Sequence, residues 1–296
     1  MFLNDYLRQE FGEKLYKLSF ELGASCPNRD GSKGVGGCYF CSEGGSGDFA
    51  VRLDEKTIDE QIELAKEKVS NKFNGDKYIA YFQSHTNTYF TDKFTREYFE
   101  KILDEMVKRE DIAVISIATR TDCIDESLVR KLASINAIKP VWVEIGLQTI
   151  HDKSRVAMNC CFTLEDFEKS FKLLEKFGIK TIVHMIAGLP EESDEDILET
   201  AEYIAKIKPF GIKIQLLHVL KNTKLADIYN SVHFRIFSME EYTDLVVKIL
   251  KMMPEDVIVH RMTGDGPADL LIEPGWSTDK KRVLNMINSK MKKSIN

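Results

Sequence analysis

Short runs rich in β-branched and aromatic residues alternate with helix-patterned segments along most of this chain, and this alternation restricts the possible folds more than any other feature. Strands are predicted at 15–22, 78–83, 112–118, 141–147, 181–187 and 212–219. Strand–helix units in series require right-handed crossovers and a parallel sheet, either open or curled into a barrel. The sequence therefore predicts an α/β fold built on six parallel strands.

Capping signals mark helix starts between these strands. The capping-box spacing occurs at Thr57 with Glu60, Thr163 with Asp166, and Ser238 with Glu241. Gly178 indicates the end of the helix that begins after Thr163. Buried phenylalanines are expected at Phe94, Phe99, Phe162, Phe167 and Phe171.

A single domain over residues 1–296 is predicted, since the chain shows no internal repeat or low-complexity tract and the polar stretch 70–77 is too short for a linker. Its hydrophobic content of 43% is ample for a buried core. We expect a core at about 15–253 and a C-terminal extension at about 254–296, which ends in a basic helix at 279–293.

Net charge and the composition of individual segments limit which partners and which cellular location are expected. The formal net charge of −6 argues against a broad nucleic-acid-binding surface but leaves room for a local basic patch. The first residues lack the basic and apolar regions of a signal peptide, and no apolar run approaches the roughly 20 residues that span a bilayer. These features predict a cytoplasmic protein with no membrane partner, whose six cysteines are reduced or bind metal.

Three cysteines, Cys26, Cys38 and Cys41, lie on the loop after the first predicted strand. That loop falls at the carboxyl end of the sheet, where α/β folds place their chemistry. Seven of the 17 glycines lie between residues 31 and 47, which lets the backbone approach a bulky group closely.

The three thiols allow three interpretations: incidental cysteines, a zinc site with His85 as a fourth ligand, or a [4Fe–4S] cluster held by three thiolates. We favour the cluster, because cluster irons take thiolate ligands and three ligands leave one iron open to bind another molecule.

Several segments together carry a resemblance to a known family. They are CPNRDGSKGVGGCYFC at 26–41, ATRTDC at 118–123, EIGLQTIHD at 144–152, HMIAGLPEE at 184–192, LLHVLKNT at 216–223 and VHRMTGDGP at 259–267. With them the chain resembles the radical S-adenosylmethionine (SAM) superfamily, and within it the small bacterial proteins of the YtqA/YhcC type. The long spacing between the first two cysteines is similar to that of the Elongator catalytic subunit.

This resemblance implies a partial (β/α)6 TIM-like barrel with a short C-terminal extension. It also implies that Cys26, Cys38 and Cys41 bind a [4Fe–4S] cluster, and that SAM is cleaved to a 5′-deoxyadenosyl radical. An electron donor such as flavodoxin or ferredoxin would reduce the cluster. By family position the expected SAM contacts are Phe40, Gln83, Glu144, Gln148, His184, Ile186 and Gly188.

The substrate that the resemblance implies is tRNA, in which the wobble uridine would lose the carboxymethyl group of a 5-carboxymethylaminomethyl side chain. A basic cluster in the C-terminal helix suits this, and comprises Lys280, Lys281, Arg282, Lys290, Lys292 and Lys293. The alternatives are a radical SAM oxidoreductase acting on a small molecule such as a tetrapyrrole, and a zinc- or cluster-binding sensor without turnover.

One position departs from the family pattern. Cys160 stands where relatives usually have an arginine, whose planar guanidinium suits the SAM carboxylate. We therefore expect either weaker SAM binding or a replacement cation such as Lys221 or Lys224.

The cluster hypothesis makes a direct prediction. Protein reconstituted without oxygen should be brown and contain about four irons per chain, and Cys38→Ala should lose the cluster because two thiolates hold it poorly. Iron analysis and the visible spectrum measure both. Stoichiometric zinc with full activity in the absence of iron would contradict the hypothesis.

Overall fold

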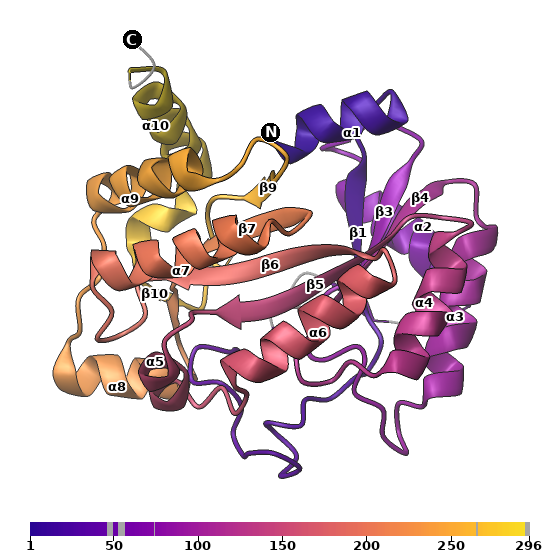
Figure 1. Cartoon of the computed structure of the whole chain (residues 1–296), viewed down its shortest axis with the longest axis horizontal. Helices are drawn as coiled ribbons and strands as arrows, with labels where there is room; N and C mark the ends of the chain where they lie inside the picture. The colour runs from indigo at the N-terminus through magenta and orange to yellow at the C-terminus, as the bar shows by residue number, and fades with distance from the viewer. Residues whose placement is uncertain (46–49, 53–56, 74, 265, 294–296) are drawn as a thin grey trace.

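The main sheet has eight strands, all parallel, in the order β2-β1-β3-β4-β5-β6-β7-β9 (Figure 1). The computed structural model describes residues 1–45, 50–52, 57–73, 75–264 and 266–293. The strands are β1 Tyr16–Glu21, β2 Val51–Arg52, β3 Tyr78–Phe82, β4 Ile112–Thr119, β5 Val141–Gln148, β6 Lys180–Ala187, β7 Gly211–Leu216 and β9 Ile258–Arg261. All six predicted strands are present, as β1 and β3 to β7.

One predicted strand is too long. The strand expected at 212–219 ends at Leu216, and Val219–Leu220 forms a separate strand, β8, which pairs antiparallel with β10 at Leu271–Glu273. The residues 216–220 form a nearly continuous apolar run, so periodicity alone could not show where the chain leaves the main sheet.

The helices fall between the strands as expected. They are α1 Leu3–Phe11, α2 Ile58–Val69, α3 Arg96–Lys108, α4 Glu126–Asn136, α5 Asp152–Ala157, α6 Leu164–Lys176, α7 Asp194–Ile207, α8 Lys224–Val232, α9 Met239–Met252, the 3₁₀ turn η1 Gly275–Thr278, and α10 Lys280–Lys293. None of the helices in the described part of the chain has the length and apolar character that a membrane crossing requires.

Local sequence signals explain the helix ends. The three predicted capping boxes form at Thr57, Thr163 and Ser238, and a further one joins Ser193 to Asp196. Gly178 follows α6 with a φ of +67°, a left-handed conformation that glycine adopts without strain, and so confirms the predicted end of that helix.

The two faces of the sheet have different partners. Along β5, Val143 and Ile145 join the main apolar core beneath the helices, whereas Glu144 between them projects to the opposite face. Four of the five phenylalanines assigned to the core are buried; the fifth, Phe162, is not. The inner face of the sheet therefore combines polar side chains such as Glu144 with a second apolar cluster that includes Ile79, Trp142 and Ile182.

The C-terminal residues join this architecture closely. Strand β9 extends the main sheet beside β7, and α10 packs on α9. The segment predicted as an extension therefore supplies a strand to the sheet on which the site is built.

Core packing yields a stability prediction. Phe99 is fully buried among Phe82, Phe90 and Phe94, so Phe99→Ala should lower the free energy of unfolding by about 3–5 kcal/mol. Urea denaturation of the apoprotein measures the loss. Lys101→Ala, at an exposed position of the same helix, should change it by less than about 0.5 kcal/mol, and similar losses in both variants would contradict the assignment.

Candidate active site at the carboxyl ends of the strands

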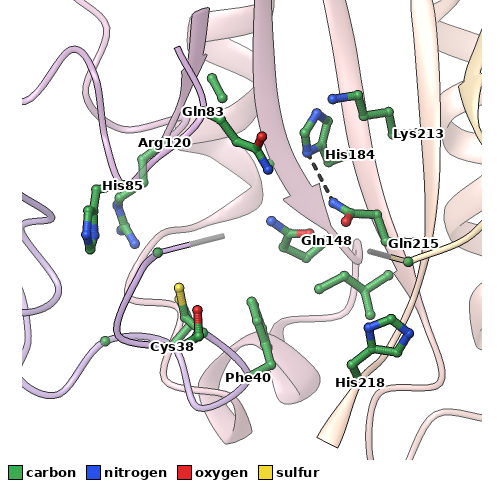
Figure 2. Close-up of a pocket in the computed structure, with 18 of the residues that line it drawn as sticks. Cys38, Phe40, Gln83, His85, Arg120, Gln148, His184, Lys213, Gln215 and His218 are labelled. Carbon is green, nitrogen blue, oxygen red and sulfur yellow. Dashed lines mark hydrogen bonds between the residues drawn. The ribbon is translucent and has the colours of Figure 1, made fainter. Parts of the chain in front are cut away.

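A central pocket opens at the carboxyl ends of the strands and gathers residues from across the chain (Figure 2). It is lined by Cys26, Cys38 and Cys41, and by the predicted SAM contacts Phe40, Gln83, Glu144, Gln148, His184 and Ile186. Gly188 is not among its lining residues. It lies in the turn after β6 with a φ of +98°, where an added Cβ would meet the Phe237 ring at 3.2 Å.

Two asparagines hold the cysteine loop in place. Asn159 donates from its amide nitrogen to the carbonyls of Val35 (3.1 Å) and Gly37 (2.8 Å). In return, Asn28 donates to the Asn159 carbonyl, and its amide nitrogen lies 3.6 Å from the Cys38 sulfur. The loop that carries the thiols is therefore fixed to the segment that follows α5.

The charges around the thiols suit an anionic group. A hydrogen bond with Cys160 and burial hold the pKa of Cys38 well above its usual range, and burial raises the pKa of Cys41 to about 11. Arg29 donates to the backbone carbonyl of Cys41 at 3.4 Å, and the Arg120 guanidinium opposes the rise at Cys38. Cys38 and Cys41 therefore stay protonated in the apoprotein, and two guanidinium groups are close enough to offset thiolate charge once iron binds.

A buried carboxylate organises the floor of the pocket. Glu144 accepts through Oε1 from Lys17 Nζ and Ser116 Oγ, both at 2.8 Å. Its Oε2 accepts from His184 Nε2 at 2.8 Å and from Lys213 Nζ. Both carboxylate oxygens are thus engaged within the protein, so a contact between Glu144 and SAM would require replacing one of these bonds.

The protonation states within this Glu144 cluster follow from its charges. Burial alone would raise the pKa of Glu144, but Lys17 and Lys213 outweigh it and hold that pKa well below the usual range. Burial and the nearby Lys213 lower the pKa of His184 to about 4. At neutral pH Glu144 is therefore ionised, and neutral His184 donates to it while Nδ1 faces the Gln215 amide at 3.2 Å.

Several pocket residues were not anticipated from the sequence. They are Arg29, Tyr81, Arg120, Lys213, Gln215, His218 and Arg261. Most lie at the carboxyl end of a strand or just beyond one. A polar residue at the end of a predicted strand was therefore the sequence signal that could have identified them.

Phe162 lines the pocket, with the Arg120 guanidinium 5.4 Å from its ring centroid, and packs only partly buried against the smaller apolar cluster, so its assignment to the core holds in part. The apolar helix stripe that begins after it suggested burial, but Phe162 precedes the α6 cap and faces the cavity.

Cys160 is buried, and the structure brings neither proposed lysine to the pocket. Lys221 donates to the Asp269 carbonyl at 2.8 Å, and Lys224 pairs with Asp227 on the exposed side of α8. The cations that do line the described pocket are Arg29, Arg120, Lys213 and Arg261. Arg120 donates to the Cys160 carbonyl at 3.0 Å, so the backbone of this segment is bound even though its side chain is a thiol.

Comparison with known proteins settles the family. A model described as the radical SAM superfamily matches residues 25–204, more than half of the chain. The chain belongs to the radical SAM superfamily. A second model, described as the Radical_SAM C-terminal domain, matches residues 209–293. The predicted [4Fe–4S] cluster and SAM are the cofactors of this enzyme superfamily, and three thiols in one pocket beside two guanidinium groups fit them.

Relatives of this radical SAM enzyme span nearly its full length. YtqA of Bacillus subtilis is 41% identical over 289 residues, 98% of this chain and 88% of the relative. YhcC of Escherichia coli is 30% identical over 281 residues, 95% of this chain and 88% of the relative. These matches confirm the YtqA/YhcC type predicted from the motifs.

More distant similarity reaches the Elongator group. A tRNA uridine(34) acetyltransferase of Methanocaldococcus jannaschii is 25% identical over 162 residues, 54% of this chain and 29% of that protein. The structure of an N-terminally truncated Elp3 of Methanocaldococcus infernus shares the fold, with a TM-score of 0.67 and 17% identity over 93% of this chain and 63% of that one. The curled, partial-barrel α/β fold is thereby confirmed.

The Glu144 cluster yields a prediction that does not depend on cofactors. Glu144→Gln should destabilise the apoprotein by about 3–5 kcal/mol, because it leaves buried Lys213 without its counter-charge. The double variant Glu144→Gln/Lys213→Met should be less destabilised than the two single changes together. Urea denaturation of all four proteins measures the coupling, and strictly additive losses would contradict the ion pair.

Proposed function

We propose that this enzyme acts on the wobble uridine of tRNA and removes the carboxymethyl group from a 5-carboxymethylaminomethyl side chain. The observation that carries the proposal is sequence similarity, over about half of the chain, to a tRNA uridine(34) acetyltransferase and to Elongator complex protein 3. A reductant such as flavodoxin or ferredoxin is part of the proposal.

The chain's own residues have defined tasks in this chemistry. Cys26, Cys38 and Cys41 would hold the [4Fe–4S] cluster, which when bound supplies the electron for reductive cleavage of SAM. The side chains of Phe40 and Ile186 provide apolar walls, and buried Gln148 Oε1 has no hydrogen-bond partner among the described residues. An unsatisfied buried acceptor in the pocket suits a ligand that donates to it.

The surface of α10 offers cations to a phosphate backbone. Lys281, Arg282, Lys292 and Lys293 are exposed along it. Lys290 is instead paired with Glu240 (2.8 Å) and Asp244 (2.6 Å) on α9. The exposed residues Lys281, Arg282, Lys292 and Lys293 therefore support tRNA binding better than the paired Lys290 does.

Profiling modified nucleosides by mass spectrometry tests the reaction. The tRNA of a deletion strain should accumulate 5-carboxymethylaminomethyluridine, and the reconstituted enzyme should convert it while releasing 5′-deoxyadenosine from SAM. Unchanged tRNA with intact SAM cleavage would point to a small-molecule substrate instead. Absence of SAM cleavage by reconstituted, reduced protein would favour a sensor.

Charge reversal on α10 tests the binding surface. Lys281→Glu with Arg282→Glu should weaken tRNA binding and lower the slope of log affinity against log salt by about 1 for each phosphate group that the helix no longer neutralises. SAM cleavage without tRNA should stay unchanged. Lys206→Glu with Lys251→Glu, at exposed positions of other helices, is the matched control. A parallel fall in SAM cleavage would show that the α10 residues support the fold.

A further inference from the structure

Cys160 lies against one of the three thiols that would hold the cluster. Its side chain is 1% exposed and belongs to the smaller apolar cluster, on which Cys38 packs. The Cys38 thiol forms a hydrogen bond with Cys160. The two chain segments are also joined through the backbone, because Tyr39 donates from its nitrogen to the Met158 carbonyl at 3.1 Å. The two sulfurs are therefore held side by side by packing and by hydrogen bonds.

The backbone of Cys160 is fixed at both its donor and its acceptor. Its nitrogen donates to the Arg155 carbonyl at 2.9 Å, and its carbonyl accepts from Arg120 at 3.0 Å. The neighbours Asn159 and Cys161 have φ values of +54° and +52°, in the left-handed region that residues other than glycine rarely occupy. Such conformations persist only where surrounding contacts hold them, and they occur often at functional sites. The contacts of this segment therefore keep the Cys160 thiol at the cysteine loop in spite of a conformational cost.

Iron binding decides which of the two sulfurs donates. A thiol loses its proton when it becomes a metal ligand, so the only thiol proton left in this contact is that of Cys160. The other acceptor near the Cys160 sulfur, among the described residues, is the Met158 carbonyl at 4.0 Å, which already accepts from Tyr39. A thiolate is the stronger acceptor because it is charged. The Cys160 thiol is therefore placed to donate to the Cys38 sulfur.

A second donor reaches the same sulfur but also has a structural task. The amide nitrogen of Asn28 lies 3.6 Å from the Cys38 sulfur and donates as well to the Asn159 carbonyl, which fastens the loop. A change at Asn28 would therefore move the loop itself. The Cys160 side chain fastens no backbone group of the loop in the part of the chain that the structure describes, so a substitution there isolates the contact with the sulfur.

We propose that Cys160 donates a hydrogen bond from its thiol to the iron-bound Cys38 sulfur and thereby raises the reduction potential of the [4Fe–4S] cluster. Such a donor draws negative charge away from the thiolate, which favours the reduced and more negative state. Burial strengthens the effect because water does not screen it. Cys160 acts here through Cys38 and for any substrate, so this inference does not depend on the proposed function.

A redox titration of the cluster in the absence of SAM tests this role. The protein is reconstituted without oxygen, its iron content is measured, and its midpoint potential is followed through the electron paramagnetic resonance signal of the reduced cluster. Cys160→Ala and Cys160→Val both remove the donor, but only the first leaves a cavity. In both variants reduction should become roughly 2- to 10-fold less favourable, the range for one hydrogen bond, which lowers the potential by about 20 to 60 mV.

Two further variants separate the hydrogen bond from packing. Cys160→Ser keeps a donor, and its potential should equal or exceed that of the wild type because a hydroxyl donates more strongly than a thiol. Cys161→Ala removes the exposed neighbouring thiol and should leave the potential unchanged.

An unchanged potential in iron-loaded Cys160→Ala and Cys160→Val would overturn the proposal. A lowered potential in Cys160→Ser, or an equal fall in Cys161→Ala, would also overturn it, since the shift would then not follow the donor. If neither Cys160→Ala nor Cys160→Val holds iron, Cys160→Ser decides: a potential at or above that of the wild type supports the hydrogen bond, and a lower one refutes it.

Discussion

The buried carboxylate of Glu144 is the interaction on which the shape of this protein depends. Lys17 on β1 and Lys213 on β7 both bind it, although these strands are separated by four others in the sheet. In a flat sheet, five strand spacings would place them about 24 Å apart, well beyond the reach of two lysines toward one residue. The sheet must therefore curl around the carboxylate, and the remaining core strands contribute Ser116, His184 and, through Lys213, the hydroxyl of Tyr81.

The curled sheet brings two groups of residues to the pocket: the cysteine loop, and a row of side chains on the last strands. At one end, the thiol loop is bound to the segment after α5 through Asn28 and Asn159, and Arg120 joins the Cys160 carbonyl to the Asp122 carboxylate. Across the sheet, strands β6, β7 and β9 place His184, Lys213 and Arg261 in one row on the inner face. Position 160, where the family resemblance predicts an arginine, thus has a structural task in its backbone carbonyl, which accepts from Arg120.

Sequence patterns predicted the features that depend on neighbouring residues in the chain. They missed the contacts between residues that are far apart in the sequence. Apolar runs located the six core strands, and cysteine spacing located the loop whose thiols line the pocket. An ionised glutamate inside an apolar strand indicated an inward-facing role, but its partners Lys17 and Lys213 lie 127 and 69 residues away, so no window of sequence could connect them. Lys221 shows the same limit: the motif fixed its place along the chain, but its ammonium group donates to the Asp269 carbonyl and does not line the pocket.

The strand that carries Arg261 is joined to the rest of the protein in an unusual way. On one side β9 pairs with β7, and on the other its Val259 forms a bridge with Phe2 and donates to the Met1 carbonyl at 2.9 Å. This edge therefore closes only after segments more than 250 positions apart have met, whereas Asn28 and Asn159, which hold the thiol loop, are 131 positions apart. A partial opening confined to β9 would release the part of the cavity wall that Arg261 forms while leaving the thiol loop intact, so the two segments can differ in their rates of hydrogen exchange.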